Sequence, residues 1–136
     1  MDWSLLIDPH KSVRINYRDL TMKNDQSPTY VFGETEPVVQ VQEGIKRQLL
    51  GYGAGLMTVK VWFEEGAEGY QHHHPHTQAS YVESGEFEAT IDGKTQLLKA
   101  GDSFYVAPNQ SHGAVCKKAG VLIDIFSPVR EDFLEE

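Results

Sequence analysis

From residue 45 onward, short apolar or alternating runs are separated by turn signals. In the run 56–63 every second residue, from Met57 to Phe63, is apolar, so these side chains share one face of a strand. Gly, Pro and Asp-Gly signals between runs are typical of turns. The pattern predicts an all-β core, as a sandwich or a barrel, with strands at residues 45–50, 56–63, 79–82, 87–91, 95–98, 103–106, 114–116 and 121–126.

Asp92-Gly93 stands between two of these runs and predicts a hairpin, because both residues tolerate a positive φ. No apolar period of 3.6 residues is sustained anywhere, which argues against a helical core. Residues 1–44 are less regular: 24–28 are polar and turn-rich, and 34–41 fit an edge strand. We therefore expect a barrel domain at 45–134 and an extension at 1–44 that packs on the barrel or on a partner subunit. Such an arrangement leaves sheet edges to cover, which favours a homodimer.

The length, the single cysteine and the net charge of the chain argue against several classes of protein. The chain has 136 residues, which suits one domain, and no apolar run approaches the roughly 20 residues that cross a bilayer. The first residues lack the features of a secretory signal, and Cys116 is the only cysteine, so no internal disulfide can form. The formal net charge of −8 argues against binding of nucleic acid. We expect a cytoplasmic protein without nucleic-acid or membrane partners.

Five of the six histidines lie between residues 72 and 112, and four of these lie within 72–76. On an extended chain His72, His74 and Gln78 share one face while His73 points away, so His72 and His74 can hold one metal ion. Further along the chain, His112 is the only histidine that can complete the site. The alternative is a solvated surface cluster that binds metal adventitiously.

Two of the remaining histidines are not expected to bind the metal ion. His76 has the parity of His72 and His74 but follows Pro75, and we expect it to contact substrate rather than metal. His10 stands apart from the cluster and is expected at the surface.

Two stretches resemble the two sequence motifs of the cupins. The first is Gly66-x5-His72-x-His74-x3-Gln78-x6-Gly85, with Gln in place of the usual Glu, and the second is Gly101-x5-Ala107-Pro108-Asn109-x2-His112. Ala107 and Asn109 replace the family's Pro and Gly, and the Asn that ends the second motif is not evident. The resemblance implies a jelly-roll (double-stranded β-helix) barrel. It also implies one divalent transition metal ion, Ni, Zn, Fe or Mn, bound by His72, His74, Gln78 and His112.

The glutamine changes the charge of such a site. Three neutral imidazoles and a neutral amide leave the +2 charge of the ion uncompensated, whereas Glu would reduce it to +1. A more positive ion polarises a bound hydroxyl or carbonyl oxygen more strongly, which favours Lewis-acid chemistry. The alternative is that Gln78 only fills the position of the glutamate.

The C-terminal residues 120–134, and also residues 45–85, resemble the pectin degradation proteins of the KdgF kind. In all, the resemblance spans residues 44–134. It implies an enzyme that converts 4,5-unsaturated monouronates, released by pectate or alginate lyases, into linear keto acids. The sequence leaves two other classes open: a non-haem metal dioxygenase of the cupin type and a non-catalytic sugar-binding cupin.

The C-terminal strand and the residues that follow it contain candidates for the groups that such a reaction needs. Asp124 lies on the face of Leu122 and Phe126, and a carboxylate in so apolar a strand is costly unless it is paired, metal-linked or catalytic. We expect Asp124 to transfer protons, Arg130 to bind the substrate carboxylate through its planar guanidinium, and Phe126 to contact the substrate. The alternative is a structural ion pair between Asp124 and Arg130.

Five other side chains are expected to be structural. Tyr81, Tyr105 and Trp62 are interpreted as packing in the barrel, although one of them can line the cavity, and Cys116 is interpreted as a small buried apolar residue. Asp102 is interpreted as a turn residue because it follows Gly101.

Overall fold

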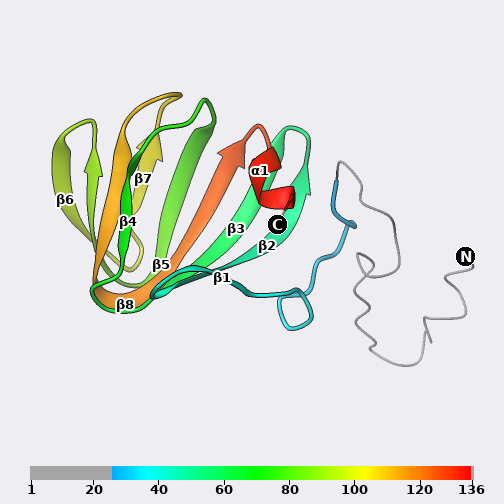
Figure 1. Ribbon diagram of the computed structural model, residues 1–136, viewed down its shortest axis with the longest axis horizontal. Coiled ribbons are helices and arrows are strands. Elements are labelled where there is room, and N and C mark those ends of the chain that lie inside the picture. Colours follow the sequence, from blue (N-terminus) through cyan, green and yellow to red (C-terminus); the bar gives the residue numbers. More distant parts are fainter. Residues whose placement is uncertain (1–25, 136) are drawn as a thin grey trace, which may run out of the picture.

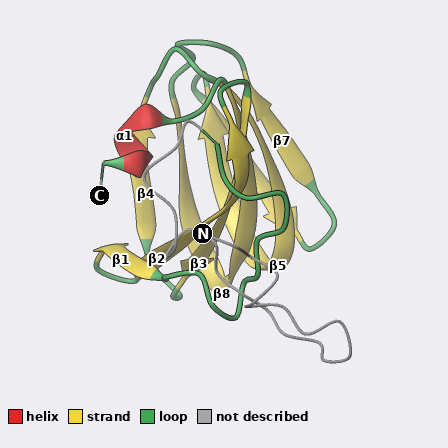
Figure 2. Ribbon diagram, turned by 90° about the vertical axis from the view of Figure 1, so that its right-hand side faces the viewer, coloured by secondary structure: helices red, strands yellow, loops and turns green. Residues whose placement is uncertain are grey.

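The computed structural model describes residues 26–135, which form a strongly curved antiparallel sheet with one short helix (Figure 1). Hydrogen bonds connect the strands in the order β1-β2-β3-β8-β5-β6, with β4 added to β8 and β7 added to β5. Figure 2 shows α1 at the margin of the sheet. The predicted all-β class is confirmed. The elements are β1 Val39–Gln42, β2 Ile45–Gly53, β3 Leu56–Phe63, β4 Glu68–His72, β5 Thr77–Ile91, β6 Lys94–Lys99, β7 Ser103–Val106, β8 His112–Ser127 and α1 Glu131–Leu134.

Two long strands replace four predicted short ones. Residues 79–82 and 87–91 are parts of β5, and residues 114–116 and 121–126 are parts of β8. The break predicted between residues 82 and 87 is a bulge within β5, where the register with β8 shifts. Gly85 has a φ of +80°, and a Cβ at Gly120 would collide with the carbonyl oxygen of Ser84. Glycine at both positions thus lets the two strands stay paired through the bulge.

Strand β4 was not predicted, because Gly66 to Gly69 reads as a turn. It pairs with the start of β8, and its register places His72 opposite His112. The predicted hairpin is confirmed: Asp92 and Gly93 have φ values of 51° and 79° between β5 and β6. Long-range pairing by β4 therefore brings the two histidine-bearing segments together.

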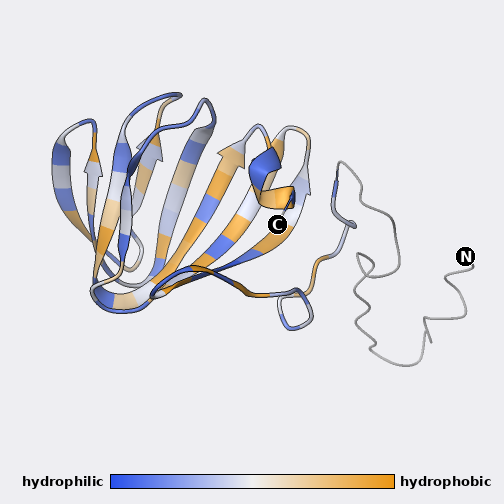
Figure 3. Ribbon diagram, in the orientation of Figure 1, coloured by the Kyte–Doolittle hydropathy of each residue, from blue (hydrophilic) through white to orange (hydrophobic). Residues whose placement is uncertain are grey.

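The core lies between the inward faces of the curved sheet. The alternation expected for β3 is confirmed, since every second residue from Met57 to Phe63 is buried and the residues between them are less buried. Figure 3 shows the hydropathy of the residues along this strand. Phe63 and Phe87 meet edge to face with ring centroids 5.1 Å apart. Cys116 is buried, as expected. The buried apolar cluster is Ile45, Met57, Val59, Val61, Phe63, Val82, Phe87, Cys116, Leu122, Phe126 and Val129.

Two tyrosines expected to pack in the barrel do not. Tyr81 is 47% exposed and Tyr105 59% exposed. Tyr81 alternates with the buried residues Ser80 and Val82, so strand parity places its ring on the outer face. The prediction of barrel packing was wrong for both tyrosines, whereas Asp102 accepts a hydrogen bond from the Lys99 backbone N–H (2.8 Å), as a turn residue would.

The segment before the barrel is described from residue 26. An edge strand is present but is shorter than the predicted 34–41, since β1 covers Val39–Gln42. The buried Gln48 side chain donates to the carbonyl oxygens of Gly33 (2.6 Å) and Glu36 (3.1 Å), which fixes this segment against β2. His10 lies outside the described residues, and the boundary at residue 44 stays a prediction. Within residues 26–135 no helix is long and apolar enough to cross a membrane.

Candidate metal centre

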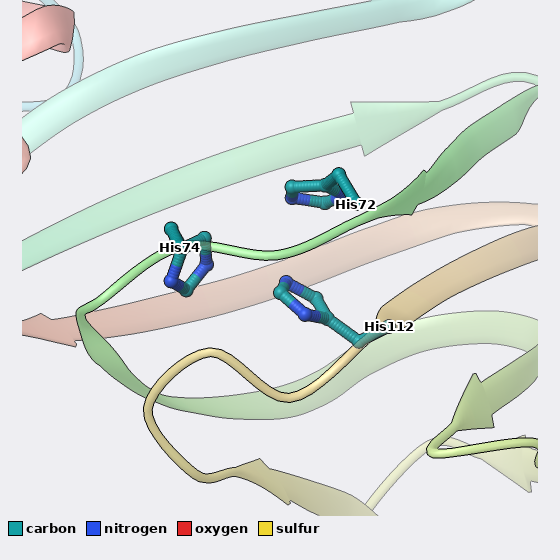
Figure 4. Close-up of side chains that lie close together, drawn as sticks. All are labelled: His72, His74 and His112. Atoms are coloured by element: carbon teal, nitrogen blue, oxygen red, sulfur yellow. The ribbon is translucent and has the colours of Figure 1, made fainter.

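Three histidine side chains converge at one end of the sheet. His72 ends β4, His74 lies in the connection to β5, and His112 begins β8. Their candidate ligand nitrogens all lie within 4.8 Å of one another, and Figure 4 shows the rings close together. His74 and His112 are buried, whereas His72 is exposed, so the cluster is open to solvent on one side. His73 is exposed, as predicted, but the expectation that His72 and His74 share a strand was wrong for His74.

The protein fixes the tautomer of each ring in the cluster. Every Nδ1 lies at hydrogen-bond distance from the backbone carbonyl oxygen of a residue two positions away. A carbonyl oxygen can only accept, so each Nδ1 carries the hydrogen and each Nε2 keeps a lone pair for a metal ion. The pairs are His72 with Tyr70 (2.8 Å), His74 with His76 (3.0 Å) and His112 with Gln110 (2.9 Å).

The environment of the Nε2 atoms fits a metal ion. His112 Nε2 is buried and has no hydrogen-bond partner among the described residues. Gln78 Oε1 lies 3.0 Å from His74 Nε2, although both atoms present lone pairs when His74 donates from Nδ1. Two ligands that are each about 2.1 Å from one ion and at a right angle to each other are separated by about 3 Å. A cation at this point would turn an unfavourable contact into two ligand bonds.

Electrostatics keeps the two buried rings neutral, which is the form that binds metal. Burial is the largest cause that lowers the pKa of His74, with the charges of Arg130 and His72 acting in the same direction. Burial likewise lowers the pKa of His112, to about 4. Both imidazoles are therefore deprotonated at neutral pH without help from a metal ion.

Gln78 is connected to Asp124 through a buried hydroxyl. Gln78 Nε2 donates to Ser80 Oγ (2.9 Å), and Ser80 Oγ donates to Asp124 Oδ1 (2.6 Å). Asp124 is partly buried, and burial raises its pKa to about 6 although the Ser80 hydrogen bond and the charge of Arg130 act in the opposite direction. A carboxyl group with this pKa can both accept and release a proton near neutral pH.

Arg130 does not form the alternative ion pair with Asp124. Its Nε and Nη2 donate to the two carboxylate oxygens of Asp132 at 3.0 and 2.8 Å, since Asp132 lies two residues away in the same turn. The guanidinium also lies over the rings of Phe126 and Phe133, with Cζ 5.1 and 4.2 Å from their centroids. The Phe126 centroid is 5.8 Å from that of His74, so Phe126 connects Arg130 to the histidine cluster.

Comparison with known sequences shows the family to which the chain belongs. The family described as "Cupin domain" matches residues 59–126, a range that contains the histidine cluster, Gln78 and Asp124. The chain belongs to the cupin family. The pectin degradation protein KdgF of Dickeya dadantii (strain 3937) is 42% identical over 107 residues, which make up 77% of this chain and 97% of that protein.

Solved structures support the same assignment. This cupin matches an RmlC-like cupin from Shewanella frigidimarina NCIMB 400 with a TM-score of 0.79 and 53% identity, over 81% of this chain and 99% of that one. It matches KdgF from Halomonas sp. with a TM-score of 0.75 and 34% identity, over 79% of this chain and 99% of that one. The recognised resemblance is thereby confirmed, both for the fold and for the relatives.

His76 lies beside this centre of the cupin but outside the cluster. It is partly buried, and its ring centroid is 5.3 Å from that of His74. Its predicted contact with substrate stays a prediction. Sequence reasoning missed Ser80 and Asp132. Ser80 lies two residues after Gln78 and therefore on the same face of the strand, which could have indicated its place in the site. Its partner Asp124, however, lies in β8, and the sequence does not show that pairing.

Proposed function

We propose that this cupin is a metal-dependent enzyme that opens the ring of 4,5-unsaturated uronates from pectin or alginate breakdown and forms linear keto uronates. The observation that carries the proposal is the position of Asp124, joined through one hydroxyl to the side chain next to the histidine cluster. The relationship to proteins named for pectin degradation supports this substrate class over others that cupins use.

In this proposal His72, His74, His112 and Gln78 hold one divalent ion, whose identity stays open among Ni, Zn, Fe and Mn. The bound ion supplies Lewis-acid polarisation of a substrate oxygen, strengthened because all four ligands are neutral. The backbone carbonyls that fix the three imidazole tautomers prepare the site before any ion arrives.

Arg130 binds the substrate carboxylate. Asp132 occupies the Nε edge of the guanidinium, and the remaining N–H groups on the two terminal nitrogens can donate to a second carboxylate. Because Asp132 and the two phenylalanine rings hold the guanidinium, little conformational freedom is lost when substrate binds. Phe126 is buried and packs against both Arg130 and His74, so its predicted contact with the sugar stays a prediction, and we expect His76 to contact the substrate on this side of the site.

Asp124 transfers the protons. Its carboxylate takes the proton of the anomeric hydroxyl, the C1–O5 bond breaks as the C1 carbonyl forms, and the ring oxygen leaves as the enolate at C5. Return of the proton to C4 converts the enol into the 5-keto group, so the reaction is an isomerisation without redox change. Positioned proton transfer of this kind is typically worth about 10²- to 10⁴-fold in rate.

The test is to incubate the protein with 4,5-unsaturated galacturonate, and separately with the unsaturated monouronates from alginate, and to identify the product by NMR. We expect the C4–C5 alkene to disappear faster than without protein, with a linear keto uronate as the product. If every unsaturated uronate is inert while oxygen is consumed with a diketone or thiol, the dioxygenase alternative is correct instead.

A further inference from the structure

A glutamine at a metal site carries an ambiguity that a glutamate does not. Only the oxygen of its amide can bind a metal ion, because the –NH₂ group has no free lone pair to offer. Rotation about the last side-chain bond exchanges the two groups. A glutamine ligand therefore needs a neighbour that distinguishes oxygen from nitrogen.

Ser80 is placed to make that distinction. Its side chain is buried, with the residue only 1% exposed, and its Oγ lies between Gln78 and Asp124. The hydroxyl has a single hydrogen, and the 2.6 Å contact with the Asp124 carboxylate uses it. Toward Gln78 the hydroxyl can then only accept, so it selects the –NH₂ group at 2.9 Å. The amide oxygen is left facing His74 at 3.0 Å.

We infer that Ser80 is a positioning residue. Because its hydroxyl hydrogen is donated to Asp124, its oxygen can only accept from the –NH₂ group of Gln78, and this keeps the amide oxygen of Gln78 directed to the metal centre. The inference rests on the metal centre of the proposed function but is independent of the substrate. The reverse orientation would direct the –NH₂ group at the histidine cluster. It would also place the amide oxygen and the Asp124 carboxylate on either side of Ser80 Oγ, whose single hydrogen can bond to only one of them.

The test measures Co²⁺ binding to the metal-stripped full-length chain, by the visible absorption of the bound ion, for the wild type and Ser80→Ala. Loss of a group that orients a metal ligand typically weakens metal affinity by about 10- to 100-fold. We expect a loss in this range together with an altered absorption spectrum. Ser27→Ala is the control, because it removes a hydroxyl that accepts from the Tyr52 backbone N–H (3.0 Å) outside the strands that carry the ligands, and it should leave the Co²⁺ affinity unchanged.

A second pair of variants, in which residue 78 is Glu, distinguishes an effect of Ser80 on the orientation of the ligand from an effect on packing. In Gln78→Glu both carboxylate oxygens can bind the ion, so adding Ser80→Ala should cost no more than about twofold in affinity. An equal loss in both backgrounds would show that Ser80 acts through packing and would overturn the inference. So would wild-type Co²⁺ affinity and spectrum in Ser80→Ala. Absence of Co²⁺ binding by the wild type would refute the metal centre itself, whereas absence of uronate turnover would refute only the proposed reaction.

Discussion

Replacement of Asp124 by Asn tests proton transfer with the smallest change of shape. The amide of Asn can still accept the hydrogen bond of Ser80, but it cannot take a proton from the substrate. We expect the Asp124→Asn variant to fold and to retain its metal, with kcat lower by about 10²- to 10⁴-fold.

Ionisation of the buried Asp124 carboxyl group lowers the stability of the folded protein. Burial raises the pKa of Asp124 from its ordinary value of 3.8 to about 6. At 1.36 kcal/mol per pKa unit, the ionised carboxylate destabilises the folded state by at most about 3 kcal/mol, and by about 2 kcal/mol once partial exposure is taken into account. Because the folded pKa is the higher one, the penalty is absent well below pH 4, grows between about pH 4 and 6, and is constant above that range.

Asp124→Asn should therefore melt at or above the temperature of the wild type at pH 7, and the difference should vanish near pH 4. Thermal unfolding is measured on metal-stripped protein, since a nearby cation would itself favour the carboxylate, and turnover is measured on metal-loaded protein. Asp102→Asn, in an exposed turn, is the control and should keep full activity. An Asp124→Asn protein with wild-type kcat would refute the proposed mechanism. Early melting at pH 7 would show a structural role instead.

Three further predictions concern the site and the assembly. His74→Ala and His112→Ala should each lower the transition-metal content from near one ion per chain by a large factor in elemental analysis of untagged protein. His73→Ala should not, and full occupancy in the double variant would refute the ligand assignment. Arg130→Ala should raise KM for an unsaturated uronate and lower kcat/KM by at least about tenfold. Asp132→Asn should have a smaller effect, and equal kinetics in the Arg130→Ala variant and the wild type would contradict carboxylate binding. Light scattering at micromolar concentration should give a homodimer, and a monomer would contradict that expectation.

Local pattern was sufficient for most strand positions, although not for β4 or for the continuity of β5 and β8, and for the histidine spacing. The alternation from Met57 to Phe63 predicts a half-buried strand because each position depends only on its immediate neighbours. The spacing of His72, His74 and Gln78 places three potential ligands within one short segment. His112 could be assigned because no other histidine follows that segment.

Features that depend on distant pairing could not be predicted. The register that sets Ser80 opposite Asp124 joins residues 44 positions apart, and no local signal specifies it. Strand β4 was missed for the same reason, since pairing with β8 overrides the turn propensity of Gly66 and Gly69. The alternative interpretation of Arg130, an ion pair with Asp124, was wrong, because the guanidinium pairs instead with Asp132, two residues away.

The most direct test of metal-dependent ring opening follows the alkene absorbance of a 4,5-unsaturated uronate. It compares buffer, metal-stripped protein, and the same protein after one equivalent of a divalent transition metal is restored. We expect the absorbance to be lost at nearly the buffer rate with stripped protein and much faster after the metal is restored, with the fast rate absent in His74→Ala. Equal rates in buffer and with restored protein would refute metal-dependent ring opening, as would full activity of the stripped protein.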